Sequence, residues 1–442
     1  SGYGINVLMV GNTTRCNTIK SCRILQLSAA GLYATSTNYC GVVLSASQYG
    51  ISSLKMDSIT IDSNEISGGY YGIYNYSLSS TPGLAFRAIN NAISNIYYAG
   101  IYIGYQDNAR LNNNSISLIP SGVGYGIYAI SLSSTIPDNA AQIIGNRITG
   151  FGYSGINLSS SVSPTTRKGI MANNVIGGNM NYQYAYGIYL SANTRWMIHH
   201  NSVNMTNAAS ITNYAALQYA SGTSVSIVNN VLARTVAGSG HVFYSTTTTG
   251  IDSFNYNHFY KLDTTAGLLY YTATRYPSSF KNINSGNANS IYKPTTFLND
   301  SNLQITDECN NGMMITTVPT DVNGVVRNVV PDMGAYEILG VQNDIGVEFI
   351  HPLALPISSG PRQINVRLRN FGANIVTSAQ IKYSFNNAAP QTVNWSGVLM
   401  PCDTANIAFT VNIPQGFSRL KIFTQTPNTV TDVNFNNDTA QR

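Results

Sequence analysis

The chain has 442 residues, of which only 9% are charged, and its formal net charge is +5. Charged residues ordinarily make up about a quarter of a globular domain, and the Lys and Arg residues here are scattered, which argues against a nucleic-acid-binding protein. No run of 18 apolar residues occurs, so the sequence predicts no membrane span. The abundance of Tyr, Asn, Ser, Thr and Gly is typical of the neutral polar surface of exported proteins.

The N-terminal half is repetitive. The phrase YGIYNYSLSS at Tyr71 returns as YGIYAISLSS at Tyr125, with related forms that begin at Tyr98, Tyr153 and Tyr184. Each unit of about 27 residues holds short alternating runs separated by Gly, Asn and Ser, and no amphipathic helix. Repeats of this length and content predict a parallel β-helix with about three short strands in each coil.

A second marker accompanies the phrase, an asparagine followed two residues later by Ile, Val, Leu or Phe. Asparagine tolerates the left-handed conformation of a sharp turn, and its amide can bond to the same amide one coil away. We therefore predict a buried ladder that fixes the register of the coils. Its members are Asn64, Asn91, Asn114, Asn146, Asn174, Asn201 and Asn230.

In the phrase GIY, we expect the glycine to open a strand, the isoleucine to point inward and the next residue to point outward. The outward positions include Tyr74, Tyr102, Tyr128 and Tyr189, which predicts an exposed aromatic stripe. Flat aromatic faces along a groove suit sugar rings, so these tyrosines are candidate ligand-binding residues. The alternative, which we favour, is that neighbouring tyrosines stack on one another and stabilise the sheet.

The repeat fades after Phe259, where FNYNHFY (254–260) is followed by DECNNG (307–312) and DVNGVVRNVVPDMGAYE (321–337). These stretches resemble the closing segment of right-handed parallel β-helix proteins exported by Bacteroidetes, although DECNNG departs from that family's SPCIDAG. The resemblance implies fold and lineage rather than chemistry. Because an open solenoid end exposes strand edges and core, we interpret residues of about 250–340 as an irregular cap.

Within this cap, Asp321, Gly324 and Arg327 follow the order that the family shows. We expect Arg327 to hold the excursion by charge-assisted bonds to Asp321 and Asp332.

Alternating runs with turn signals between them fill residues 343–442 and predict an antiparallel β-sandwich. The phrases VRLRNFGANIVTSAQIKYSFNN, GVLMPCDTANIAFTV and TDVNFNNDTA resemble Ig-like modules of the CARDB type, whose name refers to cell adhesion in bacteria. The predicted fold is thus all-β: a right-handed parallel β-helix over residues 1–340, followed by an Ig-like β-sandwich over residues 343–442.

The sequence is poor in catalytic candidates. Polysaccharide lyases on β-helices use clustered acids that hold calcium, and glycosidases use paired carboxylates. Residues 1–250 contain few acids, namely Asp57, Asp62, Glu65, Asp107 and Asp138. The three acids of KMDSITIDSNE share one coil without a matching set in the next coils, and no acid adjoins His199 or His200. We predict no catalytic residue.

The five cysteines fit no zinc or redox motif. Their spacing leaves three alternatives open: a bridge between Cys16 and Cys22, a bridge between Cys22 and Cys40, or free buried thiols.

The sandwich contains one candidate metal loop. Asp432, Asn434, Asn436 and Asp438 alternate as at the start of a calcium loop, but the glycine and terminal glutamate of an EF-hand are missing. Asp and Asn are also the default turn residues. The sequence suggests no cofactor other than calcium.

Two threonines are candidate modification sites. Proteins of the Bacteroidetes lineage carry O-linked sugars at Asp followed by Ser or Thr, which implies glycosylation of Thr404 and Thr439. The alternative is that these Asp-Thr pairs are ordinary turn residues.

The functional hypothesis is a non-catalytic structural or adhesion protein, secreted or held at the cell surface outside the outer membrane. The resemblance implies type IX secretion, and we expect surface glycans or other proteins as partners. Because the chain starts in mid-phrase (SGYGINV), we also expect further domains of a longer parent protein. The alternative is a carbohydrate-active enzyme, a polysaccharide lyase or glycosidase that uses the β-helix groove. The scarcity of carboxylates favours the first hypothesis.

Overall fold

The computed structural model describes residues 2–8, 14–25, 36–45, 47, 53, 55–119, 123–134, 140–179, 182, 184–207, 214–247, 249–283, 286–305, 309–338, 340–351, 358–432 and 434–442.

The chain divides into two compact units. The first comprises Ser1–Thr306, Ile315–Val326 and Met333–Tyr336, and the second comprises Asp307–Met314, Arg327–Asp332 and Glu337–Arg442. The predicted division assigned all residues up to 340 to the β-helix, whereas the described residues 309–314 and 327–332 pack with the second unit. A disulfide and a buried ion pair, described below, account for this difference.

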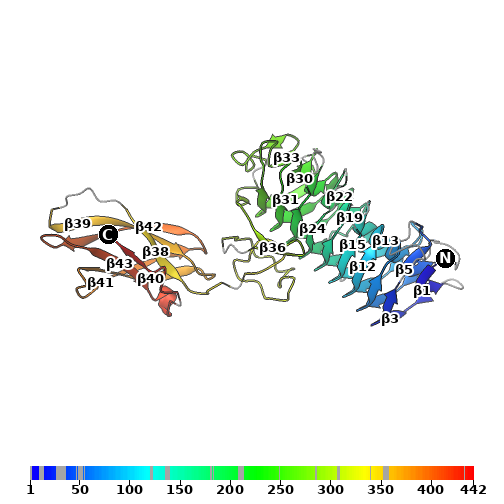
Figure 1. Cartoon of the computed structure of the whole chain (residues 1–442), viewed down its shortest axis with the longest axis horizontal. Coiled ribbons are helices and arrows are strands. Elements are labelled where there is room, and N and C mark those ends of the chain that lie inside the picture. The colour runs from blue at the N-terminus through cyan, green and yellow to red at the C-terminus, as the bar shows by residue number, and fades with distance from the viewer. Residues whose placement is uncertain are drawn as a thin grey trace. The chain divides into compact units, whose positions relative to one another are not determined.

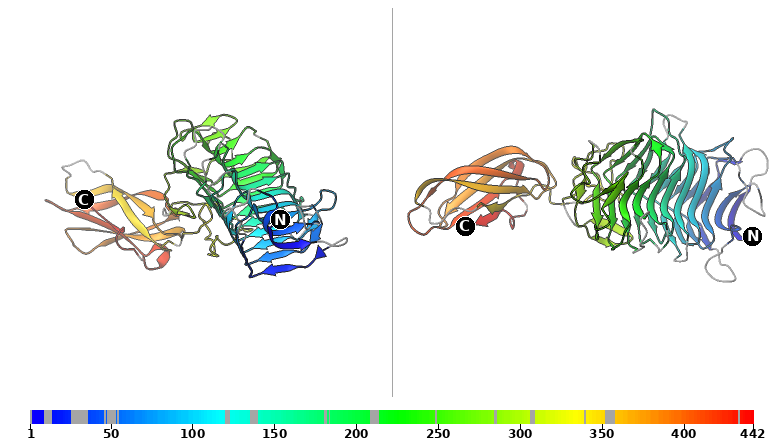
Figure 2. Two further views of the ribbon diagram at one scale, coloured as in Figure 1. Left: turned by 45° about the vertical axis from the view of Figure 1, so that its right-hand side comes forward. Right: turned by 90° about the horizontal axis from the view of Figure 1, so that it is seen from above.

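The first unit is a solenoid in which successive coils add strands to three sheets (Figures 1 and 2). The first sheet contains, in spatial order, β1 (Gly2–Leu8), β5 (Tyr39–Ser45), β9 (Tyr71–Tyr76), β13 (Ala99–Asp107), β16 (Tyr125–Ser133), β19 (Ser154–Ser159), β22 (Tyr186–Ser191), β26 (Ala215–Tyr219), β30 (His241–Ser245), β33 (Leu269–Tyr271) and β34 (Thr274–Arg275), with β10 (Gly83–Leu84) paired to β13. Its strands run parallel except for the antiparallel pair β33 and β34.

The second and third sheets are parallel throughout. The second sheet contains β3 (Thr18–Lys20), β7 (Thr60–Asp62), β11 (Arg87–Ile89), β14 (Arg110–Asn112), β17 (Gln142–Ile144), β20 (Gly169–Ala172), β24 (Trp196–His199), β28 (Val225–Val228) and β31 (Ile251–Asn255). The third sheet contains β4 (Arg23–Leu25), β8 (Glu65–Ser67), β12 (Ala92–Ile96), β15 (Ser115–Leu118), β18 (Arg147–Thr149), β21 (Val175–Gly177), β25 (Ser202–Met205), β29 (Val231–Arg234), β32 (His258–Lys261) and β35 (Ile291–Tyr292).

Three short pairs complete this unit. They are β2 (Thr14–Arg15) with β6 (Met56–Asp57), β23 (Asn193–Thr194) with β27 (Gly222–Thr223), and β36 (Phe297–Asn299) with β37 (Asn302–Ile305).

The predicted aliphatic stack is confirmed. Its isoleucines pair in register along the first sheet and have no solvent exposure: Ile73, Ile101, Ile127, Ile156 and Ile188. The recurrent glycine is explained by close packing rather than by a turn. A Cβ on Gly126 would lie 2.3 Å from Cγ2 of Ile148 in the third sheet and 2.4 Å from the carbonyl oxygen of Gly155 in the next coil.

The predicted asparagine ladder is also confirmed. Each member donates its Nδ2 to the Oδ1 of the next at 2.8 to 3.1 Å, from Asn64 through Asn230 and on to Asn257. The same amide also donates to a backbone carbonyl of the preceding coil, as Asn146 does to Leu111 at 2.7 Å. The ladder asparagines are at most 2% exposed, so their polar atoms are satisfied inside the solenoid.

One detail of the ladder prediction was wrong. The ladder asparagines do not themselves adopt the left-handed conformation; the residues directly before them do. These are Ser63, Asn90, Asn113, Gly145, Asn173, His200 and Asn229, with φ between 53° and 71°. The left-handed residue makes the sharp turn between the second and third sheets, which aims the next side chain along the solenoid axis.

The segment after the last coils has two roles in the first unit. Phe280 is 5% exposed and packs against Phe259 of β32, with ring centroids 5.8 Å apart, so it extends the core beside the final parallel coil. Leu303 of β37 and Tyr336 of the PDMGAYE phrase pack instead against Val175 of β21. This part of the segment therefore covers the outer side of the third sheet.

The second unit is an antiparallel β-sandwich with two sheets. The first of these contains β38 (Ile345–Ile350), β39 (Gly360–Asn370) and β42 (Thr404–Ile413), and the second contains β41 (Gln391–Leu399), β40 (Val376–Phe385), β43 (Leu420–Gln425) and β44 (Thr439–Gln441). A single 3₁₀ turn, η1 (Pro427–Thr429), is the helical element of the described chain. Ile364 and Leu368 of β39 pack with Ile381 and Ile422 in the buried core. The predicted all-β fold, a parallel β-helix followed by an Ig-like sandwich, is confirmed.

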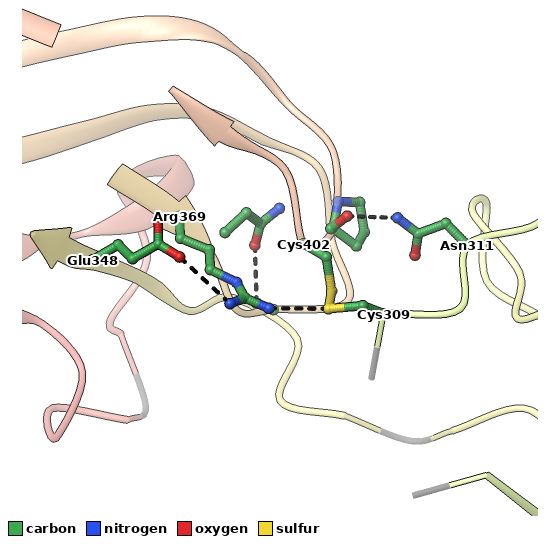
Figure 3. Close-up of a disulfide and its surroundings, with 8 residues drawn as sticks. Cys309, Asn311, Glu348, Arg369 and Cys402 are labelled. Carbon is green, nitrogen blue, oxygen red and sulfur yellow. Dashed lines mark hydrogen bonds and ion pairs between the residues drawn. A yellow bond between two sulfur atoms is a disulfide. The ribbon is translucent and has the colours of Figure 1, made fainter. Parts of the chain in front are cut away.

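A disulfide attaches residues 309–314 to the sandwich. Cys309 is bonded to Cys402 across 93 residues, beside Arg369, whose guanidinium contacts Glu348 (Figure 3). Neither bridge considered from the sequence forms, since Cys16, Cys22 and Cys40 take part in no disulfide. Cys22 instead occupies the first ladder position, where its N–H donates to Oδ1 of Asn64.

Arg327 forms a buried ion pair with a partner that the sequence did not suggest. Its guanidinium pairs with the carboxylate of Glu337 at 3.1 Å, and both side chains are at most 5% exposed. Asp332 accepts from Arg327 through its backbone carbonyl, at 3.2 Å. The carboxylate of Asp321 accepts the N–H groups of Asn323 and Val325 in its own loop.

No helix among the described residues is long and apolar enough to span a membrane.

Candidate functional sites

The predicted tyrosine stripe lies on the outer side of the first solenoid sheet. Tyr74, Tyr102 and Tyr128 are in register on β9, β13 and β16. Their rings stack, with centroids 5.3 and 5.0 Å apart and planes inclined by only 7° and 10°. Tyr74 is buried and the other two are half-buried. The stripe was predicted to be exposed; it is covered because each ring shields the face of the next.

A second set of tyrosines fills the spaces beside the stripe. Tyr71, Tyr125 and Tyr186 are at most 8% exposed, and Tyr125 meets Tyr128 edge to face, with centroids 4.6 Å apart. Burial, reinforced by neighbouring tyrosines, raises the pKa of each of these three phenols. The array is therefore neutral, and aromatic pairs of this kind each stabilise a sheet by about 0.5–1.5 kcal/mol.

Tyr189, the fourth predicted ligand residue, lies where the stack is interrupted. Its register neighbours on β19 and β26 are Asn157 and Gln218. Tyr186 contacts its ring at a centroid distance of 5.3 Å and an angle of 41°. The Oε1 atom of Gln218 is buried without a hydrogen-bond partner. Tyr189 thus differs from the other three, since amide side chains rather than aromatic rings flank it.

The acids of the first coils form ion pairs with basic side chains. Asp57 contacts Arg15 at 3.4 Å and Lys55 at 3.7 Å. The carboxylate of Asp62 accepts from Lys20 at 2.8 Å, and this bond is the main reason that the pKa of Asp62 is lowered. Asp138 lies outside the described residues. These contacts bring no pair of carboxylates together, as a glycosidase would require.

Glu65 also forms an ion pair with a basic side chain, whereas Asp107 accepts a hydrogen bond from a hydroxyl group. Glu65 contacts Arg23 at 3.2 Å, and Asp107 accepts from the hydroxyl of Ser133 at 3.3 Å.

The two histidines are structural in this arrangement. His199 is 5% exposed, and its Nε2 lies 2.8 Å from the hydroxyl of Ser226. Burial, together with the charge of Lys168, lowers the pKa of His199 to about 3. His200 contacts the amide of Asn229 and the carbonyl of Gly334. Because burial disfavours its protonated form, His199 is poorly suited to act as a general base.

The sandwich contains a compact group of carboxylates. Oxygen atoms of Asp344, Asp432 and Asp438 all lie within 4.8 Å of one another, and the three residues are 2%, 2% and 4% exposed. Asp344 directly precedes β38 and Asp438 directly precedes β44, while Asp432 follows η1. Among the described acidic, His and Cys residues, these three have side chains close enough to one another to hold a metal ion.

Hydrogen bonds hold two of these carboxylates in place. Asp432 accepts the N–H groups of Ile345 at 2.9 Å and Asn434 at 3.1 Å. Both oxygens of Asp344 accept from Nδ2 of Asn437, at 2.9 and 3.1 Å. Oδ1 of Asp438 is buried and accepts no hydrogen bond. Burial, together with the charges of Asp432 and Asp344, raises the pKa of Asp438 to about 7.

The sequence identified two of the three carboxylates in this group. Asp432 and Asp438 are members, whereas Asn434 contributes a backbone N–H and Asn436 is exposed. Asp344 was missed because it lies 93 residues from Asn437 in the chain. Its position directly before the first strand of the sandwich was the available signal.

Both candidate glycosylation sites are exposed. Thr404 begins β42, and its hydroxyl accepts from Nη2 of Arg367 at 3.1 Å. Thr439 begins β44, next to the buried Asp438. Modification of either threonine stays a prediction.

Among the solved structures that resemble part of the chain are two of a single domain from Pyrococcus furiosus. A crystal structure of the CARDB domain of the PF1109 protein, in complex with di-metal ions, is 22% identical, with a TM-score of 0.20. The match covers 24% of this chain and 90% of that one. The solution NMR structure of the same domain is also 22% identical, covers 23% and 92% of the two chains, and has a TM-score of 0.20.

No curated protein shows significant sequence similarity to the chain. A family model described as the right handed beta helix region matches residues 49–279, the span of the asparagine ladder, the aliphatic stack and the tyrosine array. Because that model covers more than half of the chain, the protein belongs to the right-handed β-helix family.

Proposed function

We propose that this protein is a non-catalytic structural or adhesion protein of the cell exterior, in which the β-helix is a rigid scaffold and the sandwich is an attachment module. The observation that carries the proposal is that the outward groups of the coils are engaged with one another. Tyr102 is stacked between Tyr74 and Tyr128, and the carboxylates of Asp57 and Asp62 contact basic side chains. Side chains that contact one another in this way stabilise the coils, and this supports a structural rather than a catalytic role.

An exported location is part of the proposal. The disulfide between Cys309 and Cys402 supports it, since such bonds persist in oxidising compartments. The resemblance of PDMGAYE and the residues before it to exported Bacteroidetes proteins supports the type IX route, with surface glycans or other proteins as partners. Further domains of a longer parent protein belong to the same proposal.

Measurement of turnover tests the non-catalytic part. The full chain is incubated with pectin, alginate and neutral polysaccharides, and products are followed by absorbance of unsaturated sugars and by reducing ends. We expect no turnover. Product formation that is lost in Asp57→Asn or Asp62→Asn, but kept in Asp252→Asn, would establish the carbohydrate-active enzyme instead.

If the solenoid binds a glycan, Tyr189 is the residue that we propose for the contact. A sugar ring packs on an open aromatic face, and the faces of Tyr102 are occupied by its two neighbours. Beside Tyr189, the in-register neighbours are the amide side chains of Asn157 and Gln218 rather than aromatic rings. Since Asn157 and Gln218 are uncharged, a neutral glycan is the expected ligand.

Two tyrosine variants distinguish the positions. On an array of neutral glycans, Tyr189→Ala should lose at least tenfold in affinity, whereas Tyr128→Ala should bind like the wild type. Equal loss in both variants, or full binding by Tyr189→Ala, would remove Tyr189 from the proposal. Circular dichroism of both variants checks that the solenoid is folded.

A further inference from the structure

Asp344, Asp432 and Asp438 bring three carboxylates close together inside the sandwich. Three carboxylates with almost no solvent exposure have oxygens within 4.8 Å of one another. Among the described residues, no Lys or Arg forms an ion pair with Asp432 or Asp438. Buried charges are costly unless they are paired or coordinate a metal.

A second observation concerns unpartnered oxygens. Oδ1 of Asp438 is fully buried and receives no hydrogen bond, although the side chain is 96% buried and directed into the group. Oδ1 of Asn437, whose own Nδ2 donates to Asp344, is likewise buried and unpartnered. Buried acceptors rarely remain unsatisfied in folded proteins. The orphaned oxygens therefore indicate a ligand that needs acceptors and supplies positive charge.

We propose that Asp344, Asp432 and Asp438 bind one calcium ion in the sandwich, with Oδ1 of Asn437 as a further candidate ligand. All of these donors are oxygens, carboxylate and amide, which is the set that Ca²⁺ prefers. The carboxylates of Asp432 and Asp344 are already oriented by the N–H of Ile345 and by the amide of Asn437. Softer metals that favour sulfur or imidazole have no such ligand in the group.

The ion would join three separate parts of the sandwich. Asp344 precedes β38, Asp432 lies in the connection after η1, and Asp438 precedes β44. Thr424 of β43 already links two of these parts, because its hydroxyl donates to the carbonyl of Ile345 and its N–H donates to the carbonyl of Asp438. Calcium should therefore tighten the C-terminal strand against the rest of the sandwich.

Calcium titration of the full chain tests the proposal. Protein treated with EDTA and dialysed is titrated with CaCl2 by isothermal calorimetry, and its thermal unfolding is followed with and without 5 mM CaCl2. We expect one bound ion and a rise of about 5 °C in the unfolding temperature of the sandwich transition. MgCl2 at the same concentration should give a smaller shift. No heat of binding and no shift in the wild type would overturn the proposal.

Two variants make the result specific. Asp438→Asn removes one ligand charge and also relieves the repulsion in the group, so the variant should fold at least as stably without calcium. Its binding should be at least tenfold weaker, with most of the temperature shift lost. Asp403→Asn, at an exposed carboxylate of the same unit, should respond like the wild type. A full calcium response in Asp438→Asn would place the ion elsewhere.

Hydrogen exchange provides a local readout. The N–H groups of Ile345 and Thr424 flank the group and should exchange more slowly with calcium, while amides of the β-helix should be unchanged. Slowing confined to the β-helix would contradict the proposal.

Discussion

Nδ2 of Asn146 donates to Oδ1 of Asn174 at 2.9 Å, one coil away, while Oδ1 of Asn146 accepts from Asn114 at 3.0 Å. The same side chain also satisfies the carbonyl of Leu111. Asn146 therefore accepts from the preceding coil through its Oδ1 and donates to both the preceding and the next coil through its Nδ2. No apolar side chain of similar size can replace it.

The variant Asn146→Leu should lower the free energy of unfolding of the β-helix by about 1–3 kcal/mol, because the polar groups of its neighbours are left unsatisfied. Urea unfolding followed by circular dichroism measures the change. Asn282→Leu, at an exposed position, is the control and should change stability by less than about 0.5 kcal/mol. An equal cost in the two variants would contradict the ladder's contribution.

The glycine of the repeated phrase should be intolerant of even one methyl group. Gly126→Ala would place Cβ 2.3 Å from Ile148 and 2.4 Å from the backbone of Gly155, and we expect a loss of about 1–3 kcal/mol from overpacking. Ala216 occupies the equivalent place beside Gly187, where alanine is accommodated. The reverse change Ala216→Gly should cost no more than about 1 kcal/mol. Thermal unfolding of both variants compares the two positions.

Acid should destabilise the β-helix partly through His199. The pKa of His199 is about 3 in the folded protein, because of its burial, against an ordinary value of 6.5. The unfolded chain therefore binds a proton between these values that the folded chain does not, and stability falls as pH drops below about 6.5. The slope is about 1.4 kcal/mol per pH unit for this one group.

The variant His199→Gln should flatten that part of the pH profile and keep a hydrogen bond within reach of Ser226. Urea unfolding between pH 4 and pH 8 gives the difference from the wild type at each pH. Near pH 8, the difference in free energy of unfolding between the two proteins should no longer change with pH. Parallel profiles at all pH values would show that His199 does not contribute.

Reduction of the disulfide should destabilise the sandwich. The bond between Cys309 and Cys402 closes a loop of 93 residues, and removal of a native disulfide typically costs about 2–5 kcal/mol. Unfolding of Cys402→Ser should resemble that of the wild type with a reducing agent, and the β-helix transition should be unaffected. A sandwich that unfolds at the same denaturant concentration with and without the reducing agent would refute this expectation.

Native material should carry sugars at Thr404 and Thr439, both of which are exposed. Intact-mass spectrometry of protein from its native host should show added hexose-containing mass that is absent after production in a heterologous cytoplasm. Bare polypeptide in the native sample would end this idea.

The sequence by itself was sufficient for the solenoid. Each coil repeats the same local constraints, so the spacing of Asn114, Asn146 and Asn174 and the inward position of Ile127 could be inferred from periodicity alone. The left-handed residue was misplaced by one position, because Asn113 and Asn114 both satisfy the same preference for a turn. The exposure of Tyr102 was overestimated, because the solvent exposure of a side chain depends on its neighbours in the adjacent coils, here Tyr74 and Tyr128.

Only the tertiary structure decided which distant residues meet. The partnership of Cys309 with Cys402 and the contact of Asp344 with Asn437 each span 93 residues, and neither lies within a repeat. Antiparallel strands of a sandwich bring chain segments together according to the order of the strands in its sheets, which leaves no periodic trace in the sequence. The sequence suggested Asp432 and Asp438, but only the fold added Asp344, because burial and proximity, rather than residue type, distinguish these three carboxylates from ordinary turn residues.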